Sequence, residues 1–432
     1  MPHSIQHIYS LFTKNPVVCT DTRNIIPGAM FFALKGETFN GNEFAQKAID
    51  GGCAYAIIDE EKYNTGDKFI LVDDVLKTLQ LLAREHRREH NISVIAITGS
   101  NGKTTTKELF NAVLSKKYKV LATKGNLNNE IGVPLTLLGL NKDHDIAIIE
   151  MGARKQGDIK ELVEITEPTH GIITNVGKAH LEMMGGIEGV IKTKTELYDY
   201  LEKQGGATFI RFEDEVLMSK APELKRITYG CKDKANVVGK LMVDMPHITF
   251  TWKLSIENRF GPTVTSPMMG SYNFQNILAA IAAGVHFKVP HVLINEAIED
   301  YIPTNNRSQV LKTERNTLFL DAYNANPTSM EAAIRSFARV EADKKALILG
   351  EMLEVGELSE AEHEYIIQIA TSLNMSELYL VGAEFKKVTK SFPTFNTVEE
   401  LKADLTSRHL SGRTILIKGS RKNKLEEIVE VL

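Results

Sequence analysis

A β-branched apolar run over Ile92–Thr98 leads directly into a glycine-rich segment, Thr98–Thr105, with the sequence TGSNGKTT. Apolar residues at helical spacing over 109–114 predict that a helix follows, from about Thr104 to Lys116. A strand, a glycine-rich turn and a helix in this order form the setting that a phosphate-binding loop requires. This part of the chain is therefore expected to fold as an α/β domain around a parallel sheet.

The residue types in this turn suit phosphate binding. Gly99 and Gly102 allow a backbone geometry that a β-carbon would hinder, so backbone amides and the helix N-terminus can converge on phosphate oxygens. Lys103 adds positive charge near the β- and γ-phosphates, and Thr104 offers a hydroxyl to Mg²⁺. The spacing is GxxGKT rather than the common GxxxxGK[ST], and a chance match at a plain helix start is the alternative. The residues predicted to contact nucleotide phosphates are Gly99, Ser100, Asn101, Gly102, Lys103, Thr104 and Thr105.

Three regions of the chain differ in pattern. Residues 1–88 mix short apolar strands with helices, residues 89–308 alternate strands and helices, and residues 309–432 repeat that alternation. Such alternation indicates mainly parallel sheets with right-handed crossovers. We expect an α/β protein with three domains at these boundaries: a small mixed α/β N-terminal domain, a central P-loop ATPase-like domain with a parallel sheet, and a C-terminal Rossmann-like domain. The final stretch, 424–432, is predicted to be helical.

Two polar residues follow predicted strands of the central region. Glu150 comes directly after the apolar strand Ile146–Ile149, and His180 follows the strand at 171–174. Since ligands of open α/β sheets bind at the carboxyl ends of the strands, both residues are expected near the phosphate loop. A hard cation takes oxygen ligands, so Glu150 is a candidate ligand for Mg²⁺. A surface carboxylate and a hydrogen-bonded structural histidine are the alternatives.

Composition argues against several other classes of protein. The formal net charge is −4, so bulk charge suggests no polyanionic partner, and the basic pairs Arg87-Arg88 and Lys116-Lys117 are expected to be solvated helix faces. The three cysteines are too scattered for a disulfide framework or a zinc site. No apolar run approaches the roughly 20 residues of a membrane span, and the first residues lack the pattern of a signal peptide. We therefore expect a cytoplasmic protein.

Several longer motifs resemble the Mur ligase family, and the resemblance spans nearly the whole chain. TGSNGKTT, IEMGAR and TNVGKAHLE occur at the family's distances. The segment 21–52 is similar to the family's uridine-nucleotide-binding domain, although Asn40-Gly41-Asn42 stands where members often carry Asp-Gly-His. The segments that most resemble members adding D-alanyl-D-alanine to a muramoyl peptide are 123–138 (TKGNLNNEIGVPLTLL), 321–330 (DAYNANPTSM), 349–363 and 418–421 (KGSR).

The resemblance implies a ligase that depends on ATP and Mg²⁺. It would join D-alanyl-D-alanine to UDP-N-acetylmuramoyl-tripeptide through an acyl phosphate, giving the UDP-muramoyl-pentapeptide precursor of peptidoglycan. We expect a monomer without nucleic-acid partners or membrane insertion. One alternative is another Mur-type amino-acid ligase or a folylpolyglutamate synthase, against which DAYNANP and GNLNNEIG argue. The other is a non-catalytic P-loop nucleotide-binding protein, which would not need Glu150 or the acceptor-side motifs.

The resemblance also implies roles for individual residues. Catalytic roles fall on Lys103, Glu150, His180, Lys194 and Arg307, and metal positions on Thr104, Glu150, His180 and, if its amine is carbamylated, Lys194. Further contacts with ATP fall on Asn273, Asn276, Arg307, Asp321 and Asn324. The residues implied in binding the other substrates are Asp21, Thr22, Arg23, Lys35, Asn126, Asn128, Asn129 and Asn326. Lys418, Ser420 and Arg421 are candidates for binding a carboxylate or phosphate.

Ordinary structural roles remain open for some of these residues. Lys194 could be a helix-surface lysine, and Asn276 could face the helix that follows it. The asparagines after Asp321 suit a helix-capping turn. Tyr272 stands where family members often carry histidine, so a nucleotide contact from that position is not assigned.

Overall fold

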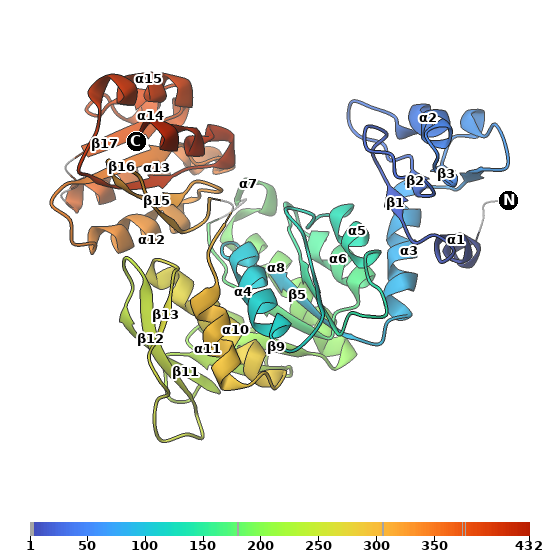
Figure 1. Cartoon of the computed structure of the whole chain (residues 1–432), viewed down its shortest axis with the longest axis horizontal. Helices are drawn as coiled ribbons and strands as arrows, with labels where there is room; N and C mark the ends of the chain where they lie inside the picture. The colour runs from blue at the N-terminus through green and yellow to red at the C-terminus, as the bar shows by residue number, and fades with distance from the viewer. Residues whose placement is uncertain (1–3, 179–180, 305, 374, 376) are drawn as a thin grey trace.

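A computed structural model describes residues 4–178, 181–304, 306–373, 375 and 377–432. The strands in this part of the chain form three sheets, of four, nine and six strands in chain order. Figure 1 shows the N-terminal and C-terminal domains on opposite sides of the central domain. The predicted fold class, an α/β protein with three domains, is confirmed.

The N-terminal domain carries a parallel sheet in the order β1-β2-β3-β4. Successive side chains of a strand point to opposite faces of the sheet, so alternate residues pack into two separate apolar clusters. Phe31 and Ala56 share a cluster with residues of α2, whereas Phe32 and Ile57 share one with α1 and α3. The elements are α1 (Ile5–Phe12), β1 (Val18–Cys19), β2 (Met30–Phe32), η1 (Gly41–Phe44), α2 (Ala45–Asp50), β3 (Tyr55–Ile58), η2 (Glu61–Tyr63), β4 (Phe69–Leu71) and α3 (Val75–Arg88).

The central domain is built on a sheet in the order β13-β12-β11-β10-β9-β8-β5-β7-β6. All pairings from β6 to β11 are parallel, and β12 and β13 are added antiparallel. The elements are β5 (Ser93–Thr98), α4 (Lys103–Ser115), β6 (Val120–Ala122), α5 (Gly132–Leu137), β7 (Ile146–Glu150), α6 (Asp158–Thr166), β8 (His170–Ile173), α7 (Leu181–Met184), α8 (Gly186–Gln204), β9 (Ala207–Arg211), α9 (Glu215–Ser219), β10 (Lys225–Gly230), β11 (Val237–Val243), β12 (Ile248–Leu254), β13 (Val264–Ser266), α10 (Ser271–His286) and α11 (His291–Asp300).

Strand β5 is buried on both faces, as its continuous apolar sequence predicts. Val94 and Ala96 belong to the cluster that includes α6 and α8, whereas Ile95 and Ile97 pack with α4 and α10. The strand therefore ends inside the molecule, with β8 on one side and β7 on the other. This position brings the loop after β5 next to the loops that follow its two neighbours.

The C-terminal domain has a sheet in the order β14-β15-β19-β16-β17-β18, parallel except for β14. Leu347 and Leu349 pack towards α12 and α13, and Ala346 and Ile348 towards α15 and η5. The elements are β14 (Gln309–Lys312), β15 (Thr317–Asp321), α12 (Pro327–Ala338), β16 (Lys345–Gly350), η3 (Gly356–Leu358), α13 (Ser359–Ser372), β17 (Glu377–Val381), α14 (Ala383–Val388), β18 (Thr394–Phe395), α15 (Val398–Arg408), β19 (Thr414–Lys418), η4 (Arg421–Asn423) and η5 (Leu425–Val431).

Helix α3 attaches the N-terminal domain to the central domain (Figure 1). Gln80 Nε2 donates to Glu161 Oε1 at 2.7 Å, and His86 Nε2 lies 3.0 Å from the carbonyl oxygen of Leu140. Arg87 is buried, and its Nε donates to the carbonyl oxygen of Thr166 at 3.1 Å. The prediction of a solvated Arg87 was wrong, because this helix packs against a second domain.

The predicted elements agree with the structure within a few residues, with two differences. The final stretch forms the 3₁₀ helix η5 rather than an α-helix. Strands β1, β6, β9–β14 and β18 were not predicted. In β12 and β13 the residues alternate between buried and less buried positions, so these two strands form no continuous apolar run. None of the helices in the described part of the chain combines the length and the apolar character that a membrane-spanning segment requires.

Candidate active site

A cavity of about 740 Å³ lies at the carboxyl ends of β5 and β7, where the central and C-terminal domains meet. Its walls include the phosphate loop, Ser100–Thr105, and Glu150 at the end of β7. Asp321 and Lys418, at the ends of β15 and β19, line it from the C-terminal domain, and Leu76 lines it from α3. All three domains thus contribute to one cavity.

The phosphate loop needs both of its glycines. Gly99 has φ +141° and Gly102 has φ +79°, conformations that L side chains rarely adopt. A β-carbon on Gly99 would lie 2.1 Å from Thr174 Oγ1. The residues after β8 hold the loop from that side: Thr174 Oγ1 donates to the carbonyl oxygen of Asn101 at 2.5 Å, and the amide of Asn101 donates to Asn175 Oδ1 at 3.1 Å. The loop is therefore shaped before any ligand binds.

Lys103 begins α4 and faces the cavity. Its ammonium donates to the carbonyl oxygens of Gly99, at 2.7 Å, and Ser100, at 3.3 Å. Burial lowers the pKa of Lys103, Glu150 acts in the opposite direction, and Arg307 lowers it further. An anion in the cavity would favour the charged ammonium, so this lysine is suited to bind phosphate.

Glu150 presents an unsatisfied oxygen to the cavity. Its side chain is buried, and Oε1 accepts a hydrogen bond from Asn128 Nδ2 at 2.8 Å. Oε2 has no hydrogen-bond partner within the described residues. A buried carboxylate oxygen without a partner is costly unless a cation binds it, and Mg²⁺ prefers oxygen ligands. Together with the hydroxyl of Thr104, which lines the same cavity, this carboxylate fits a magnesium site.

Lys194 and His180 are the other two predicted metal ligands. Lys194, on α8, is buried but is not among the residues that line the cavity. Burial, assisted by Lys103, lowers the pKa of Lys194 to about 7. Much of its amine is therefore neutral near neutral pH, which is the form that reacts with carbon dioxide. His180 lies outside the described residues, and the part of the chain that the structure describes holds no group of three His, Cys, Asp or Glu side chains placed to bind a metal.

Arg307 is stacked on a tyrosine of the C-terminal domain. Its guanidinium carbon lies 3.7 Å from the centroid of the Tyr323 ring, and both residues line the cavity. Arg307 Nε is buried and has no hydrogen-bond partner among the described residues. The guanidinium of Arg421 lies 5.4 Å from the same ring. Stacking fixes the direction of Arg307 and leaves N–H groups available for an anion.

Asn273 and Asn276, on α10, line the cavity but are largely engaged with the protein. Asn273 Nδ2 donates to the carbonyl oxygen of Met269 and to Ser308 Oγ, each at 2.8 Å. Asn276 Nδ2 donates to Asn273 Oδ1 at 3.0 Å. Both amide hydrogens of Asn273 are thereby used, so its predicted contact with adenine would rest on its carbonyl oxygen or on rearrangement.

The predicted residues of the C-terminal domain divide into two groups. Asp321 and Asn324 line the cavity, where Lys418 Nζ donates to Asp321 Oδ2 at 2.7 Å and to the carbonyl oxygen of Asn324 at 3.2 Å. Asn326 does not line the cavity: its Oδ1 accepts from the amide of Ser329 at 2.9 Å, which caps α12. Ser420 lies outside the cavity as well, and its hydroxyl donates to the carbonyl oxygen of Glu351.

Asn326 nevertheless joins the two halves of the site. Its Nδ2 donates to Asn101 Oδ1, in the phosphate loop, at 2.7 Å. Nearby, the amide of Lys178 donates to Thr328 Oγ1 at 3.4 Å, and the Lys178 ammonium forms an ion pair with Glu362. The start of α12 therefore rests directly on the central domain.

The asparagines predicted to meet the peptide substrate lie in the cavity wall. Asn126, Asn128 and Asn129 all line it. Asn129 Oδ1 accepts from the amide of Gly132 at 2.9 Å, at the start of α5. Asn128 and Asn129 are thus held by the protein, while no partner fixes the side chain of Asn126 within the described residues.

Asp21, Thr22, Arg23 and Lys35 lie in the N-terminal domain, and none of them lines the cavity. Asp21 and Arg23 form an exposed ion pair with an N–O distance of 2.7 Å. Arg23 holds the pKa of the Asp21 carboxyl at about 2. These residues stay predicted contacts for a uridine nucleotide, at a distance from the phosphate loop.

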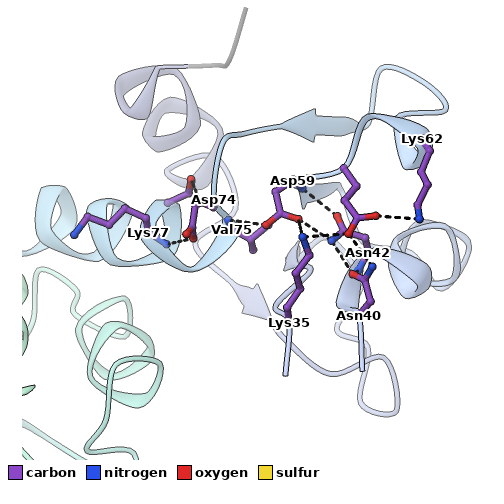
Figure 2. A network of polar contacts seen from close by, with 10 residues as sticks. Lys35, Asn40, Asn42, Asp59, Lys62, Asp74, Val75 and Lys77 are labelled. Carbon is purple, nitrogen blue, oxygen red and sulfur yellow. Dashed lines mark hydrogen bonds and ion pairs between the residues drawn. The ribbon is translucent and has the colours of Figure 1, made fainter. Parts of the chain in front are cut away.

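Lys35 belongs to a polar network at one end of the N-terminal sheet (Figure 2). Its ammonium lies 2.8 Å from Asp59 Oδ1 and 3.1 Å from Glu60 Oε1. Asn42 is fully buried, and its Nδ2 donates to Asp59 Oδ1 at 2.8 Å, while Asn40 Nδ2 donates to Glu60 Oε1 at 2.9 Å. The two asparagines that depart from the family's Asp-Gly-His thus fix the carboxylates that hold Lys35.

The sequence interpretation missed several side chains of the cavity, among them Arg154, Lys155 and Tyr323. Arg154 is the last residue of the motif IEMGAR, and Tyr323 lies within DAYNANP. Both motifs were recognised, but neither residue was assigned a role. Lys155 follows directly in the chain. Their position beside strand ends was the available signal.

Comparisons with protein families match the chain in three consecutive pieces. They are a Mur ligase family catalytic domain over 17–87, a Mur ligase middle domain over 97–284, and a Mur ligase glutamate ligase domain over 306–421. A UDP-N-acetylmuramoyl-tripeptide–D-alanyl-D-alanine ligase of Bacillus subtilis (strain 168) is 35% identical over 96% of this chain and 92% of its own length. The chain belongs to the Mur ligase family.

Solved structures of Mur ligases agree with the whole fold. One is a UDP-N-acetylmuramoylalanyl-D-glutamyl-2,6-diaminopimelate–D-alanyl-D-alanyl ligase from Acinetobacter baumannii. It has a TM-score of 0.84 and 28% identity, with 100% of this chain and 98% of that chain covered. A second, the MurF ligase from Thermotoga maritima in complex with ADP, has a TM-score of 0.87 and 26% identity, with 96% of each chain covered. The predicted membership of the Mur ligase family is therefore confirmed.

Proposed function

We propose that this Mur ligase joins D-alanyl-D-alanine to UDP-N-acetylmuramoyl-tripeptide at the expense of ATP. The observation that carries the proposal is the cavity itself, which Lys103, Glu150 and Arg307 line together with the phosphate loop. Relatives over nearly the full length carry this activity in their names, and a similar structure holds ADP. ATP and Mg²⁺ are the proposed cofactors.

The first step would activate the tripeptide. An amide does not form spontaneously from a carboxylate and an amine in water, so the terminal carboxylate attacks the γ-phosphorus of ATP. The bond between the γ-phosphorus and the bridging oxygen breaks, and ADP leaves with an acyl phosphate in place. Lys103 and Arg307 offset the negative charge that moves towards the leaving group. The loop amides hold the phosphates in line for the attack.

The second step would form the amide. The amine of D-alanyl-D-alanine attacks the carbonyl carbon of the acyl phosphate, and the tetrahedral intermediate collapses with loss of inorganic phosphate and a proton. No side-chain nucleophile is needed. Positioning of two anionic reactants and neutralisation of their charge carry the catalysis.

Glu150 and Thr104 would hold Mg²⁺, with His180 and a carbamylated Lys194 as further proposed ligands. When bound, the cation supplies charge neutralisation at the phosphate oxygens. The unpartnered Oε2 of Glu150 supports this assignment, and the depressed pKa of Lys194 supports carbamylation.

We further propose a cytoplasmic monomer with domain boundaries at 1–88, 89–308 and 309–432. Side chains from all three domains of one chain line the cavity, so no second copy is needed to complete it. ATP and UDP-linked precursors are cytoplasmic compounds, which supports that location.

Release of ADP and mass of the product test the proposal directly. The protein would be assayed with ATP, Mg²⁺, UDP-muramoyl-tripeptides carrying lysine or diaminopimelate as the third residue, and a panel of amine acceptors. We expect ADP release only when tripeptide and D-alanyl-D-alanine are both present, and a product heavier by one dipeptide. A preference for a single amino acid or for a folate would favour the alternative ligases, and absence of ligation with every acceptor would favour a non-catalytic nucleotide-binding protein.

A further inference from the structure

The cavity extends beyond the nucleotide loop towards the N-terminal domain. After Glu150, the chain lines it with Gly152–Lys155 and then with Asp158 and Glu161 of α6. Helix α6 packs against α3, whose Leu76 lines the same cavity. This wall therefore connects the proposed site of phosphate transfer with the domain proposed to hold the uridine nucleotide.

Two cations, Arg154 and Lys155, lie on this wall. Arg154 and Lys155 line the cavity, and both side chains are exposed. Within the described residues, neither side chain forms a hydrogen bond or an ion pair, although Asp158 and Glu161 line the same wall. Those two carboxylates have other partners: Asp158 accepts from backbone amides, and Glu161 accepts from Gln80 Nε2.

The backbone that carries the two cations is fixed. Asp158 Oδ2 accepts from the amides of Arg154, at 2.8 Å, and Lys155, at 3.0 Å. Glu196, on α8, accepts from the amide of Gly157 through Oε1 at 2.8 Å. These hydrogen bonds fix the backbone of Arg154 and Lys155, so both side chains extend from fixed positions at the cavity wall.

The chemistry of the acceptor peptide supplies a matching anion. The substrate named for the Acinetobacter baumannii relative contains a D-glutamyl residue between alanyl and diaminopimelate. A glutamyl residue has two carboxyl groups, and only one of them can be joined to the next residue. The other remains ionised at neutral pH beside the terminal carboxylate that is to be activated.

We infer that Arg154 and Lys155 form a binding site for the non-reacting glutamyl carboxylate of the muramoyl-tripeptide. The inference rests on the proposed function and adds a substrate-reading site to it. The planar guanidinium of Arg154 can bind a carboxylate through two hydrogen bonds, and Lys155 adds a point charge. By holding this carboxylate, the pair leaves the terminal carboxylate as the one that reaches the γ-phosphate.

Paired changes in enzyme and substrate test the inference. The variants are Arg154→Gln, Lys155→Gln and the double variant, with Lys160→Gln as a control that removes a charge from the exposed side of α6 outside the cavity. The substrates are UDP-muramoyl-tripeptide with the glutamyl carboxylate free or converted to the amide. Initial rates of ADP release give KM for each substrate, and thermal melting checks that the variants fold.

We expect the double variant to raise KM for the free-carboxylate tripeptide about 10-fold or more, the scale of a charged hydrogen bond, while KM for ATP and for D-alanyl-D-alanine changes less than about twofold. The wild type should discriminate against the amidated tripeptide by a similar factor, and the double variant should not. Lys160→Gln should behave as the wild type.

Three results would overturn the inference while leaving the proposed function intact. The first is an unchanged KM for the tripeptide in the double variant. The second is discrimination against the amide that persists at full size without the two cations. The third is a loss only of a preference for diaminopimelate over lysine, which would mean that the bound carboxylate belongs to the third residue. Failure of the wild type to ligate any tripeptide would count against the proposed function itself.

Discussion

Lys103 is the residue on which the proposed phosphate chemistry depends most. Its ammonium is held by two carbonyl oxygens of its own loop, so the side chain is in place before the nucleotide arrives. Lys103→Ala should fold normally and lower kcat for ADP release about 100-fold or more, because charge developing on the leaving ADP loses a fixed cation. Lys116→Ala, at the other end of α4, is the matched control. Turnover at the wild-type rate in Lys103→Ala would rule out its role.

Tyr323 should act as a positioning residue for Arg307. A stacked guanidinium contributes about 0.5–2 kcal/mol, so Tyr323→Leu should weaken ATP binding between about 2-fold and 30-fold, whereas Tyr323→Phe should retain most of it. In an Arg307→Ala background, Tyr323→Leu should add little, because the two residues act together. Equal losses in both backgrounds would show that Tyr323 serves the fold alone. Melting temperatures provide one control, and Tyr365→Leu, at an exposed position of α13 outside the cavity, provides the other.

Helices, strands and loops could be predicted from the sequence wherever one strong local signal determined the structure. β5, the phosphate loop and α4 follow from a buried run, two glycines and helical spacing. The proximity of Glu150 to the loop follows from the rule that strand ends meet at one sheet edge. Contacts between distant elements had no such signal. Three such contacts join segments that are far apart in the chain or depend on packing. They are the hydrogen bond from Arg87 to Thr166, the stacking of Arg307 on Tyr323 and the hydrogen bond from Asn273 to Ser308.

The junction of β8 and α10 should make the stability of the protein depend on pH. His170 Nε2 lies 3.0 Å from His286 Nε2, and burial, with His286 and Lys225 contributing, lowers the pKa of His170 from 6.5 to about 4. Since the folded-state pKa is below the unfolded one, the unfolded chain takes up the proton first as the pH falls. Stability should therefore be full above about pH 6.5 and decline until about pH 4, by on the order of 3 kcal/mol at most.

His170→Gln removes this titration and keeps a hydrogen-bonding side chain. Its melting temperature should fall less than that of the wild type between pH 7.5 and pH 5. Parallel declines in the two proteins would mean that other groups cause the acid sensitivity.

At the scale of the whole molecule, the C-terminal domain is joined to the central domain through a short connection. Asn306 and Ser308 have φ of +57° and +48°, and Arg307 lies between them. Met269 of the central domain packs into the apolar cluster of the C-terminal domain, and polar pairs accompany this contact: Asn326 with Asn101, Lys178 with Glu362, and Arg339 with Asp244. Polar contacts of this kind exchange readily with water, so the angle between the two domains should respond to ligands.

Nucleotide binding is expected to draw the C-terminal domain inward. The nucleotide would then contact Lys103 and Arg307 of the central domain and, at the same time, Asn324 of the C-terminal domain. Small-angle scattering should show a smaller radius of gyration with ATP analogue, Mg²⁺ and UDP-tripeptide than without them. Asn326→Ala, which removes the contact with the phosphate loop, should shift the ligand-free protein towards a larger radius. Superimposable scattering curves with and without ligands would argue against closure.

A crystal structure with a non-hydrolysable ATP analogue would show directly whether this loop binds the triphosphate. We expect β- and γ-phosphate oxygens within hydrogen-bonding distance of the amides of residues 99–105 and of the Lys103 ammonium, with Arg307 reaching the same anion. A triphosphate bound elsewhere, with this loop making no contact to it, would rule out the proposed phosphate chemistry.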